Sequence, residues 1–180
     1  MKKLLLHTCC APCAPHVIAL LQKEFELTVL FYNPNIHPRE EYELRLRDLQ
    51  RYCGENSIAL MTGEYDADRW FSAVKGMEGQ EEGAQRCELC YRLRLETTAC
   101  VAQLQGIDHF ATTLTVSPHK KAIVINRIGC EVGEHHALVF YEADFKKGDG
   151  FKKSCELGKH YNFYRQRYCG CVYSIPRNRV

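Results

Sequence analysis

The sequence predicts an α/β fold in which a five-stranded parallel sheet carries helices on both faces. Short apolar runs alternate along the chain with longer segments whose apolar residues recur every three or four positions. Such alternation favours parallel strands, joined by right-handed crossovers that cover both faces of the sheet. The 180 residues suffice for one domain with a sizeable core. We expect the core over residues 1–144, with a basic C-terminal segment, residues 145–180, packed on it.

The individual strands and helices follow from the spacing of apolar residues. Runs rich in β-branched and aromatic side chains are typical of strands. Helices are expected where apolar residues share one helical face, as Ile18, Leu21 and Phe25 do. The strands are expected at residues 4–6, 27–32, 58–61, 109–114 and 137–141, and the helices at residues 14–25, 42–53, 67–74, 87–104 and 118–129.

Turn and capping residues separate these elements. The loop at residues 33–38 contains two prolines, which stop the neighbouring strand and helix from extending into it. Ser117 and Pro118 fit the N-cap and the first position of the last expected helix. Residues 76–85 are rich in glycine and glutamate, so we expect a flexible surface loop there.

The predicted topology brings several groups of polar and cysteine residues to one edge of the sheet. In a parallel sheet, the carboxyl ends of the strands and the amino ends of the following helices share an edge, and ligands bind there. The segments expected at this edge are residues 9–13, 33–38, 87–90 and 112–119.

Cysteines dominate two of these segments. Cys87 and Cys90 form a C-x-x-C, a spacing that serves zinc, iron–sulfur and thioredoxin-like sites alike. Taken alone, this spacing is explained equally well by one buried structural cysteine and a second cysteine that is there by chance. Together with Cys9 and Cys10 at the same edge it predicts a metal site, because four thiolates suit zinc or a 4Fe-4S cluster. Adjacent cysteines fit a zinc knuckle poorly, which favours the cluster.

A third cysteine motif, Cys169-Gly170-Cys171, lies near the C-terminus. This spacing can close a small strained disulfide, with glycine easing the backbone, and strained disulfides are typically labile or catalytic. Two incidental thiols in a loop are the alternative. The remaining isolated cysteines are interpreted as small buried hydrophobic residues: Cys53, Cys100, Cys130 and Cys155.

Composition limits the cellular setting and the partners. Eleven cysteines without a signal-sequence pattern, and no apolar run as long as a membrane span, predict a protein of the reducing cytoplasm with no membrane association. The C-terminal segment has nine Lys or Arg against two acids, and seven aromatic residues. Basic side chains attract phosphates and aromatic rings stack on bases, so we expect this segment to contact RNA. A charged helix with a packed aromatic face is the alternative.

Six stretches of the chain together resemble one family, the epoxyqueuosine reductases of the QueH type. They are TCCAPC at residues 8–13, YNPNIHP at 32–38, RCELCYRLRL at 86–95, FATTLTVSPHK at 110–120, DFKK at 144–147 and YRQRYCGCVYS at 164–174. The resemblance implies a HUP-type sheet, like that of PP-loop enzymes, with strand order 3-2-1-4-5. It also implies reduction of epoxyqueuosine to queuosine at the anticodon wobble position of tRNA, the final step of queuosine biosynthesis, with an external electron donor.

The resemblance further implies the residues of the site. A 4Fe-4S cluster is carried over to Cys9, Cys10, Cys87 and Cys90, and a redox-active disulfide to Cys169 and Cys171. For an adjacent mononuclear iron or zinc we select Cys13 and Asp66. The expected substrate contacts are Asn33, Asn35, His37, Lys120 and Arg165. The competing hypotheses are a PP-loop-like tRNA thiolase and a zinc-stabilised RNA-binding module.

Overall fold

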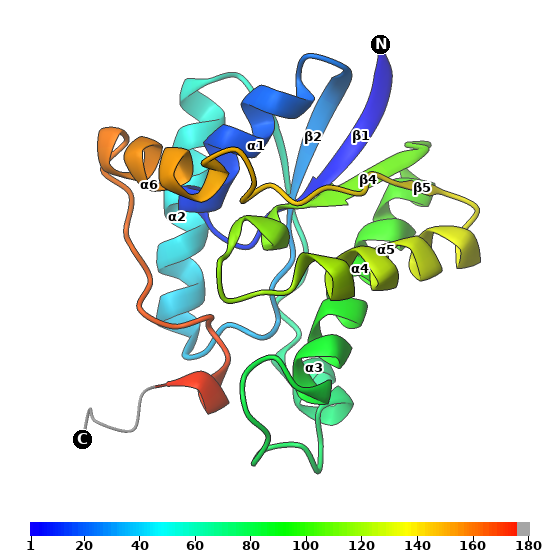
Figure 1. The fold of residues 1–180 in the computed structure, drawn as a ribbon, viewed down its shortest axis with the longest axis vertical. Coiled ribbons are helices and arrows are strands. Elements are labelled where there is room, and N and C mark those ends of the chain that lie inside the picture. The colour runs from blue at the N-terminus through cyan, green and yellow to red at the C-terminus, as the bar shows by residue number, and fades with distance from the viewer. Residues whose placement is uncertain (176–180) are drawn as a thin grey trace.

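The computed structural model describes residues 1–175, and its centre is a five-stranded, wholly parallel sheet in the order β3-β2-β1-β4-β5 (Figure 1). The predicted fold class and strand order are thereby confirmed. The strands are β1 Lys2–His7, β2 Phe25–Phe31, β3 Ala59–Thr62, β4 His109–Thr112 and β5 Val139–Phe140. The α-helices are α1 Ala14–Leu21, α2 Arg39–Glu55, α3 Ala67–Ala73, α4 Gln85–Leu104, α5 Ala122–His135 and α6 Gly150–His160.

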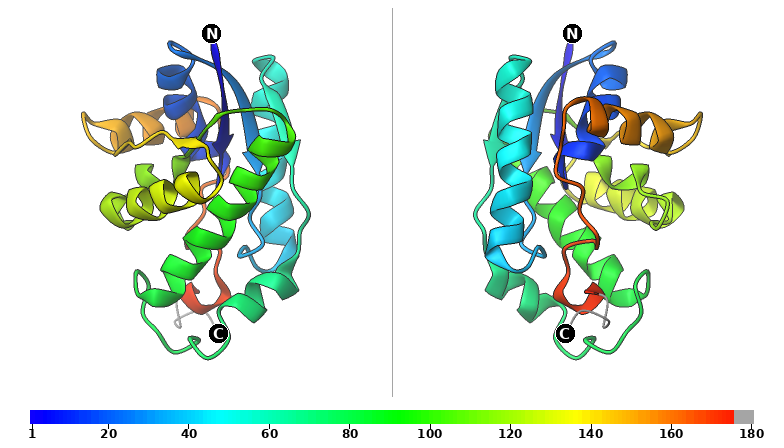
Figure 2. Two further views of the ribbon diagram at one scale, coloured as in Figure 1. Left: turned by 90° about the vertical axis from the view of Figure 1, so that its right-hand side faces the viewer. Right: turned by 90° about the vertical axis from the view of Figure 1, so that its left-hand side faces the viewer.

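Alternate side chains of the central strand face two separate hydrophobic clusters. Leu4 and Leu6 pack with apolar residues of α1 and α2, whereas Leu5 packs with those of α4 and α5. Successive side chains of a strand point to opposite faces, so a strand covered on both sides is apolar throughout. Figure 2 shows α1 and α2 on one side of the sheet and α4 and α5 on the other.

The C-terminal segment covers the α1 and α2 side and then crosses the carboxyl edge of the sheet. Phe145 and Phe163 belong to the same hydrophobic cluster as β1. Beyond α6 the chain descends to lie beside α3 and the amino end of α4 (Figure 2). Tyr173 there stacks on Trp70 of α3. The last five residues of the segment lie outside the described residues, and its division from the core at residue 144 stays a prediction.

Three sequence-based expectations about the helices are corrected. α1 ends at Leu21, because Phe25 is a buried residue of β2 and not the end of the helical stripe. α5 begins at Ala122, because Ser117 and Pro118 occupy a turn after the short 3-10 helix Thr113–Val116. α4 begins close to Cys87, as predicted. Cys100 was expected to be buried on this helix but is exposed, because the helix buries a different face.

The other isolated cysteines differ in burial. Cys53 is buried as predicted, whereas Cys130 and Cys155 are only half-buried. No helix within residues 1–175 combines the length and the apolar character needed to cross a membrane.

Candidate metal and redox site

Three thiols converge in the loop that follows β1. The chain turns from extended backbone at Cys10 into a 3-10 helix, Ala11–Cys13, with Pro12 in its first turn. This turn directs Cys9, Cys10 and Cys13 to one point, with their sulfur atoms all within 4.8 Å of one another. The Cys10 and Cys13 sulfurs are 3.2 Å apart, and those of Cys9 and Cys10 are 3.6 Å apart. Three free thiols in this arrangement suit a soft metal ion or an iron–sulfur cluster.

A buried histidine, His7, ends β1 and fixes the start of this loop through hydrogen bonds. The His7 Nδ1 atom lies 2.8 Å from Oγ1 of Thr112, and its Nε2 atom donates to the Tyr32 carbonyl at 3.1 Å. Burial, assisted by the positive charge of Arg94, lowers the pKa of His7 to about 4. His7 is therefore neutral near pH 7 and joins β1, β2 and β4 at the point where the thiols begin.

The thiols of this loop do not titrate alike. Hydrogen bonds from Cys10 and Cys13 hold the pKa of Cys9 well below its usual range. Hydrogen bonds with Cys10 and Cys9, together with burial, raise the pKa of Cys13. Among the three, Cys9 is thus the sulfur that carries negative charge most readily, because its pKa is lowered whereas those of Cys10 and Cys13 are raised.

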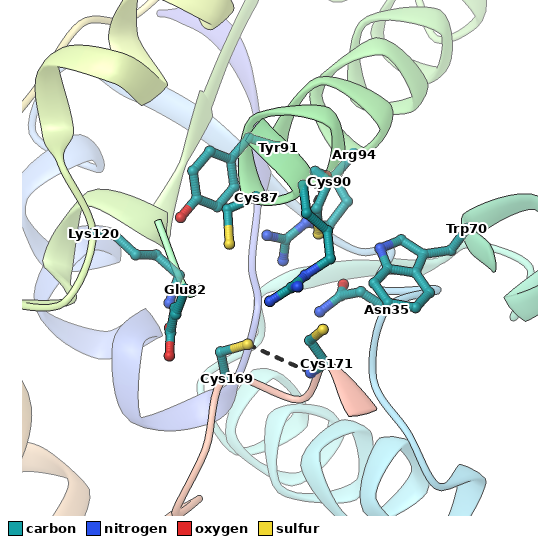
Figure 3. A pocket seen from close by; sticks show the side chains of 11 residues that line it. Asn35, Trp70, Glu82, Cys87, Cys90, Tyr91, Arg94, Lys120, Cys169 and Cys171 are labelled. Carbon is teal, nitrogen blue, oxygen red and sulfur yellow. Dashed lines mark hydrogen bonds between the residues drawn. The ribbon is translucent and has the colours of Figure 1, made fainter. Parts of the chain in front are cut away.

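Cys87 and Cys90, at the amino end of α4, are among the residues that line an adjoining small cavity of about 20 Å³. Figure 3 shows the Cys87 thiol pointing into this cavity, with Cys169 and Cys171 below it. The four residues expected to bind a cluster therefore come from two neighbouring positions, the loop after β1 and the start of α4. The ligand set itself stays a prediction.

A second, larger cavity of about 650 Å³ opens beside the first. Cys9, Cys13 and Cys169 all line it, so both the loop thiols and the C-terminal motif face the same space. Four residues line both cavities: Glu82, Arg94, Lys120 and Cys169. Further basic side chains line the larger one: Arg45, Lys159, Arg165 and Arg167. The combination of thiols and cations suits an anionic substrate that undergoes redox chemistry.

The Cys169-Gly170-Cys171 motif is held in place by backbone contacts. The His37 amide donates to the Gly170 carbonyl at 2.8 Å, and the buried Arg45 donates to the carbonyls of Tyr168 and Cys169, each at 3.1 Å. Gly170 adopts a φ of 109°, which other residues rarely adopt. Both cysteines are free thiols in this structure. A hydrogen bond from Cys171, with help from Lys120, lowers the pKa of Cys169, whereas the pKa of Cys171 is raised.

The expected substrate and second-metal residues lie in different environments. Lys120 and Arg165 line the larger cavity, and Asn35 lines the smaller one. Asn33 is completely buried and donates to the Thr8 carbonyl. Asp66 caps α3 by accepting a hydrogen bond from the Arg69 amide at 3.0 Å.

His37 has a different environment again. It is buried, its ring stacks on Phe71, and its Nδ1 atom lies 3.1 Å from the Tyr65 hydroxyl. Asn33, His37 and Asp66 are absent from the lining of both cavities within residues 1–175.

Two residues near the thiols were not identified from the sequence. Gln166 donates to the sulfur of Cys10 at 3.0 Å, and Arg94 lies between the two cavities. Arg94 could have been identified from the sequence, because it follows Cys90 by one helical turn and therefore lies on the same face of α4. Gln166 could not have been identified in this way, because its contact with Cys10 depends on the path of the C-terminal segment across the sheet edge.

Comparisons with known proteins identify the family of the chain. The family described as "Epoxyqueuosine reductase QueH" matches residues 4–177. A relative with that name from Streptococcus pyogenes is 38% identical over 183 residues, 98% of this chain and 72% of that protein. Another from Thermotoga maritima is 36% identical over 182 residues, 99% of this chain and 93% of that protein.

Among solved structures, the U34-tRNA thiolase NcsA from Methanococcus maripaludis with its [4Fe-4S] cluster has a TM-score of 0.60 at 13% identity, over 97% of this chain and 61% of that one. At this identity the likeness concerns the fold. The family match and the relatives span nearly the whole chain, including every cysteine of the site. The chain therefore belongs to the epoxyqueuosine reductase QueH family.

Proposed function

We propose that this protein is an oxidoreductase that reduces epoxyqueuosine to queuosine in the anticodon of tRNA. The observation that carries the proposal is that the thiols of Cys9, Cys13 and Cys169 face one cavity that is also lined by basic side chains. Conversion of an epoxide to an alkene consumes two electrons and two protons and releases water. A cavity for this reaction must supply electrons beside a site that accepts RNA.

The cysteines are fit ligands for a 4Fe-4S cluster, which we assign to Cys9, Cys10, Cys87 and Cys90. The donor set consists of thiols only, and soft thiolates bind iron–sulfur clusters. Such a cluster, when bound, supplies electrons one at a time. For a further mononuclear iron or zinc we propose Cys13, whose sulfur belongs to the convergent group. Asp66, the other residue expected at this metal, is not part of the convergent group and caps α3 through a hydrogen bond from the Arg69 amide.

Basic and aromatic residues of the larger cavity would bind the anticodon. Lys120, Arg165 and Arg167 lie on its lining, where their charges can neutralise RNA phosphates. Phe151 and Tyr168 also line it and offer faces on which an unstacked base can stack. Single-stranded loops are the parts of RNA that proteins read in this way, which suits an anticodon loop.

Cys169 and Cys171 would carry electron pairs to the site. Oxidation of these two thiols to a disulfide releases two electrons and two protons, which is what the epoxide consumes. Cys169 is suited to this role because it lines both cavities and its pKa is lowered. An external donor must then reduce the disulfide, and a strained disulfide of this spacing would be reduced readily.

The proposed function is tested by tRNA analysis in a strain that lacks the gene. We expect epoxyqueuosine to accumulate and queuosine to disappear, with recovery on return of the wild-type gene. Protein purified without oxygen should contain iron and acid-labile sulfide and should convert the epoxide in isolated tRNA. Unchanged queuosine with loss of a thiolated nucleoside would instead identify a thiolase. A colourless protein that holds only zinc would identify an RNA-binding module.

A further inference from the structure

Arg94 is a buried cation between the two groups of cysteines. Its side chain extends from α4, and the residue is only 3% exposed. The guanidinium donates through Nε to the Cys90 carbonyl at 3.3 Å and through Nη1 to Oδ1 of Asn33 at 3.2 Å. Both acceptors are neutral. None of the carboxylates within residues 1–175 forms an ion pair with Arg94.

Two other arginines within residues 1–175 are buried, and their charges are satisfied differently. Arg45 forms an ion pair with Glu41 at 2.6 Å. Arg86 donates to three backbone carbonyls, those of Met77, Glu78 and Gln80, and so fastens the loop that was expected to be flexible. Arg94 has two neutral acceptors and no carboxylate, so its charge is the least compensated of the three.

A buried charge without a counter-ion is costly, because burial removes the water that would solvate it. Glu82 lines both cavities but forms no ion pair with Arg94, and the other side chains of the lining that can carry negative charge near pH 7 are cysteines. Arg94 lines the smaller cavity together with Cys87 and Cys90, and the larger cavity together with Cys9. Cys90 and Cys9 come from the two positions that the proposed cluster joins. The guanidinium therefore lies where anionic sulfur from both positions can compensate it.

Hydrogen bonds also connect Arg94 to the loop after β1. Asn33 accepts from Arg94 and donates through Nδ2 to the Thr8 carbonyl at 3.0 Å, directly before Cys9. The series Arg94–Asn33–Thr8 thus runs from the helix that carries Cys87 and Cys90 to the loop that carries Cys9. This explains why Asn33, expected at the substrate, is completely buried instead.

We propose that Arg94 is the counter-ion of the anionic sulfur centre and that its charge raises the reduction potential of the cluster bound there. The inference rests on the proposed function, since it concerns the same cluster. Reduction adds negative charge to the centre, and a fixed positive charge nearby stabilises the reduced state more than the oxidised one. The wild-type protein should therefore accept electrons more readily than a variant without this charge.

The test is an anaerobic redox titration of the reconstituted protein, followed by electron paramagnetic resonance. Arg94→Gln removes the charge, and Arg94→Lys keeps it. We expect the equilibrium constant for cluster reduction to fall at least tenfold in Arg94→Gln, about 59 mV for one electron. Arg94→Lys should stay close to the wild type. Arg92→Gln is the matched control, because Arg92 lies on the same helix with its side chain 39% exposed and paired with Glu131.

Each outcome bears on the inference. An unshifted potential in loaded Arg94→Gln overturns it, as does an equal shift in Arg94→Lys, which would indicate geometry and not charge. If Arg94→Gln binds no cluster, normal iron and sulfide content in Arg94→Lys supports the counter-ion role, and loss in both variants contradicts it. A wild-type protein without iron and sulfide refutes the proposed function and the inference together, whereas a loaded wild type with unshifted variants refutes the inference alone.

Discussion

The loop at residues 9–13 and the Cys169-Gly170-Cys171 motif both present free thiols to the larger cavity, but they are built differently. The loop follows directly from the central strand and is supported by the buried ring of His7. The motif lies on a segment without regular secondary structure, held by hydrogen bonds to Gly170 and to the carbonyls beside it.

This difference in construction matches a difference in proposed chemistry. Metal ligands must keep a fixed geometry, which the strand and the 3-10 helix provide. A thiol pair that opens and closes a disulfide must rearrange at each cycle, and a segment held by a few hydrogen bonds permits this. We therefore expect one rigid group of sulfurs, Cys9, Cys10 and Cys13, and one adjustable group, Cys169 and Cys171, at the same cavity.

Removal of a loop thiol should have the largest effect. We expect Cys10→Ser to lose most of its bound iron and sulfide and to lower turnover by more than about a hundredfold, because the change replaces a proposed ligand that is buried in the convergent group. Iron and sulfide assays with tRNA turnover measure this. Cys100→Ser, exposed on α4, should behave as the wild type. Full loading of Cys10→Ser would remove Cys10 from the ligand set.

The anchorage of the adjustable group can be tested through Arg45. Its ion pair with Glu41 is buried, so we expect Arg45→Met to lower the free energy of unfolding by about 3–5 kcal/mol. Urea unfolding measures this. Arg39→Met breaks an ion pair of the same spacing on the same helix, but an exposed one, and should cost less than about 1 kcal/mol. Equal costs would show that the C-terminal segment does not depend on Arg45.

The support of the rigid group should be sensitive to acid. The pKa of His7 is about 4 in the folded protein and 6.5 ordinarily, so the unfolded chain binds the extra proton between these values. His7 therefore lowers stability as the pH falls from 6.5 towards 4, by up to about 3 kcal/mol, and has no such effect above pH 6.5. Urea unfolding of metal-free protein at several pH values measures this. His7→Gln should lose that part of the acid sensitivity; an unchanged profile would contradict the assignment.

The smallest expected effect concerns the backbone of the motif. A Cβ atom at residue 170 would lie 2.8 Å from Cγ1 of Ile36, at a φ that disfavours alanine. We expect Gly170→Ala to cost about 1–3 kcal/mol of stability, measured by thermal or urea unfolding. Gly79→Ala, with open space around the site, is the control. A neutral Gly170→Ala would indicate that the motif moves freely.

The sequence alone determined the order and type of the five strands and of the helices up to α5, and with them the edge of the sheet where the cysteines gather; α6, Gly150–His160, was not predicted. Apolar periodicity indicates which face of each strand or helix is buried. This part of the structure can therefore be predicted from residues close together in the sequence. The positions of Cys9, Cys10, Cys87 and Cys90 at that edge follow from topology alone.

Only the tertiary structure decided what the side chains at that edge contact. Whether Asn33 faces a substrate or joins Thr8 to Arg94 depends on distances between residues far apart in the chain. Asp66 likewise caps α3, and the sequence around it is compatible with this role but does not exclude others. Apolar periodicity shows which residues are buried, but not which distant donor or acceptor forms a hydrogen bond with them. The chemistry of this site depends on those contacts.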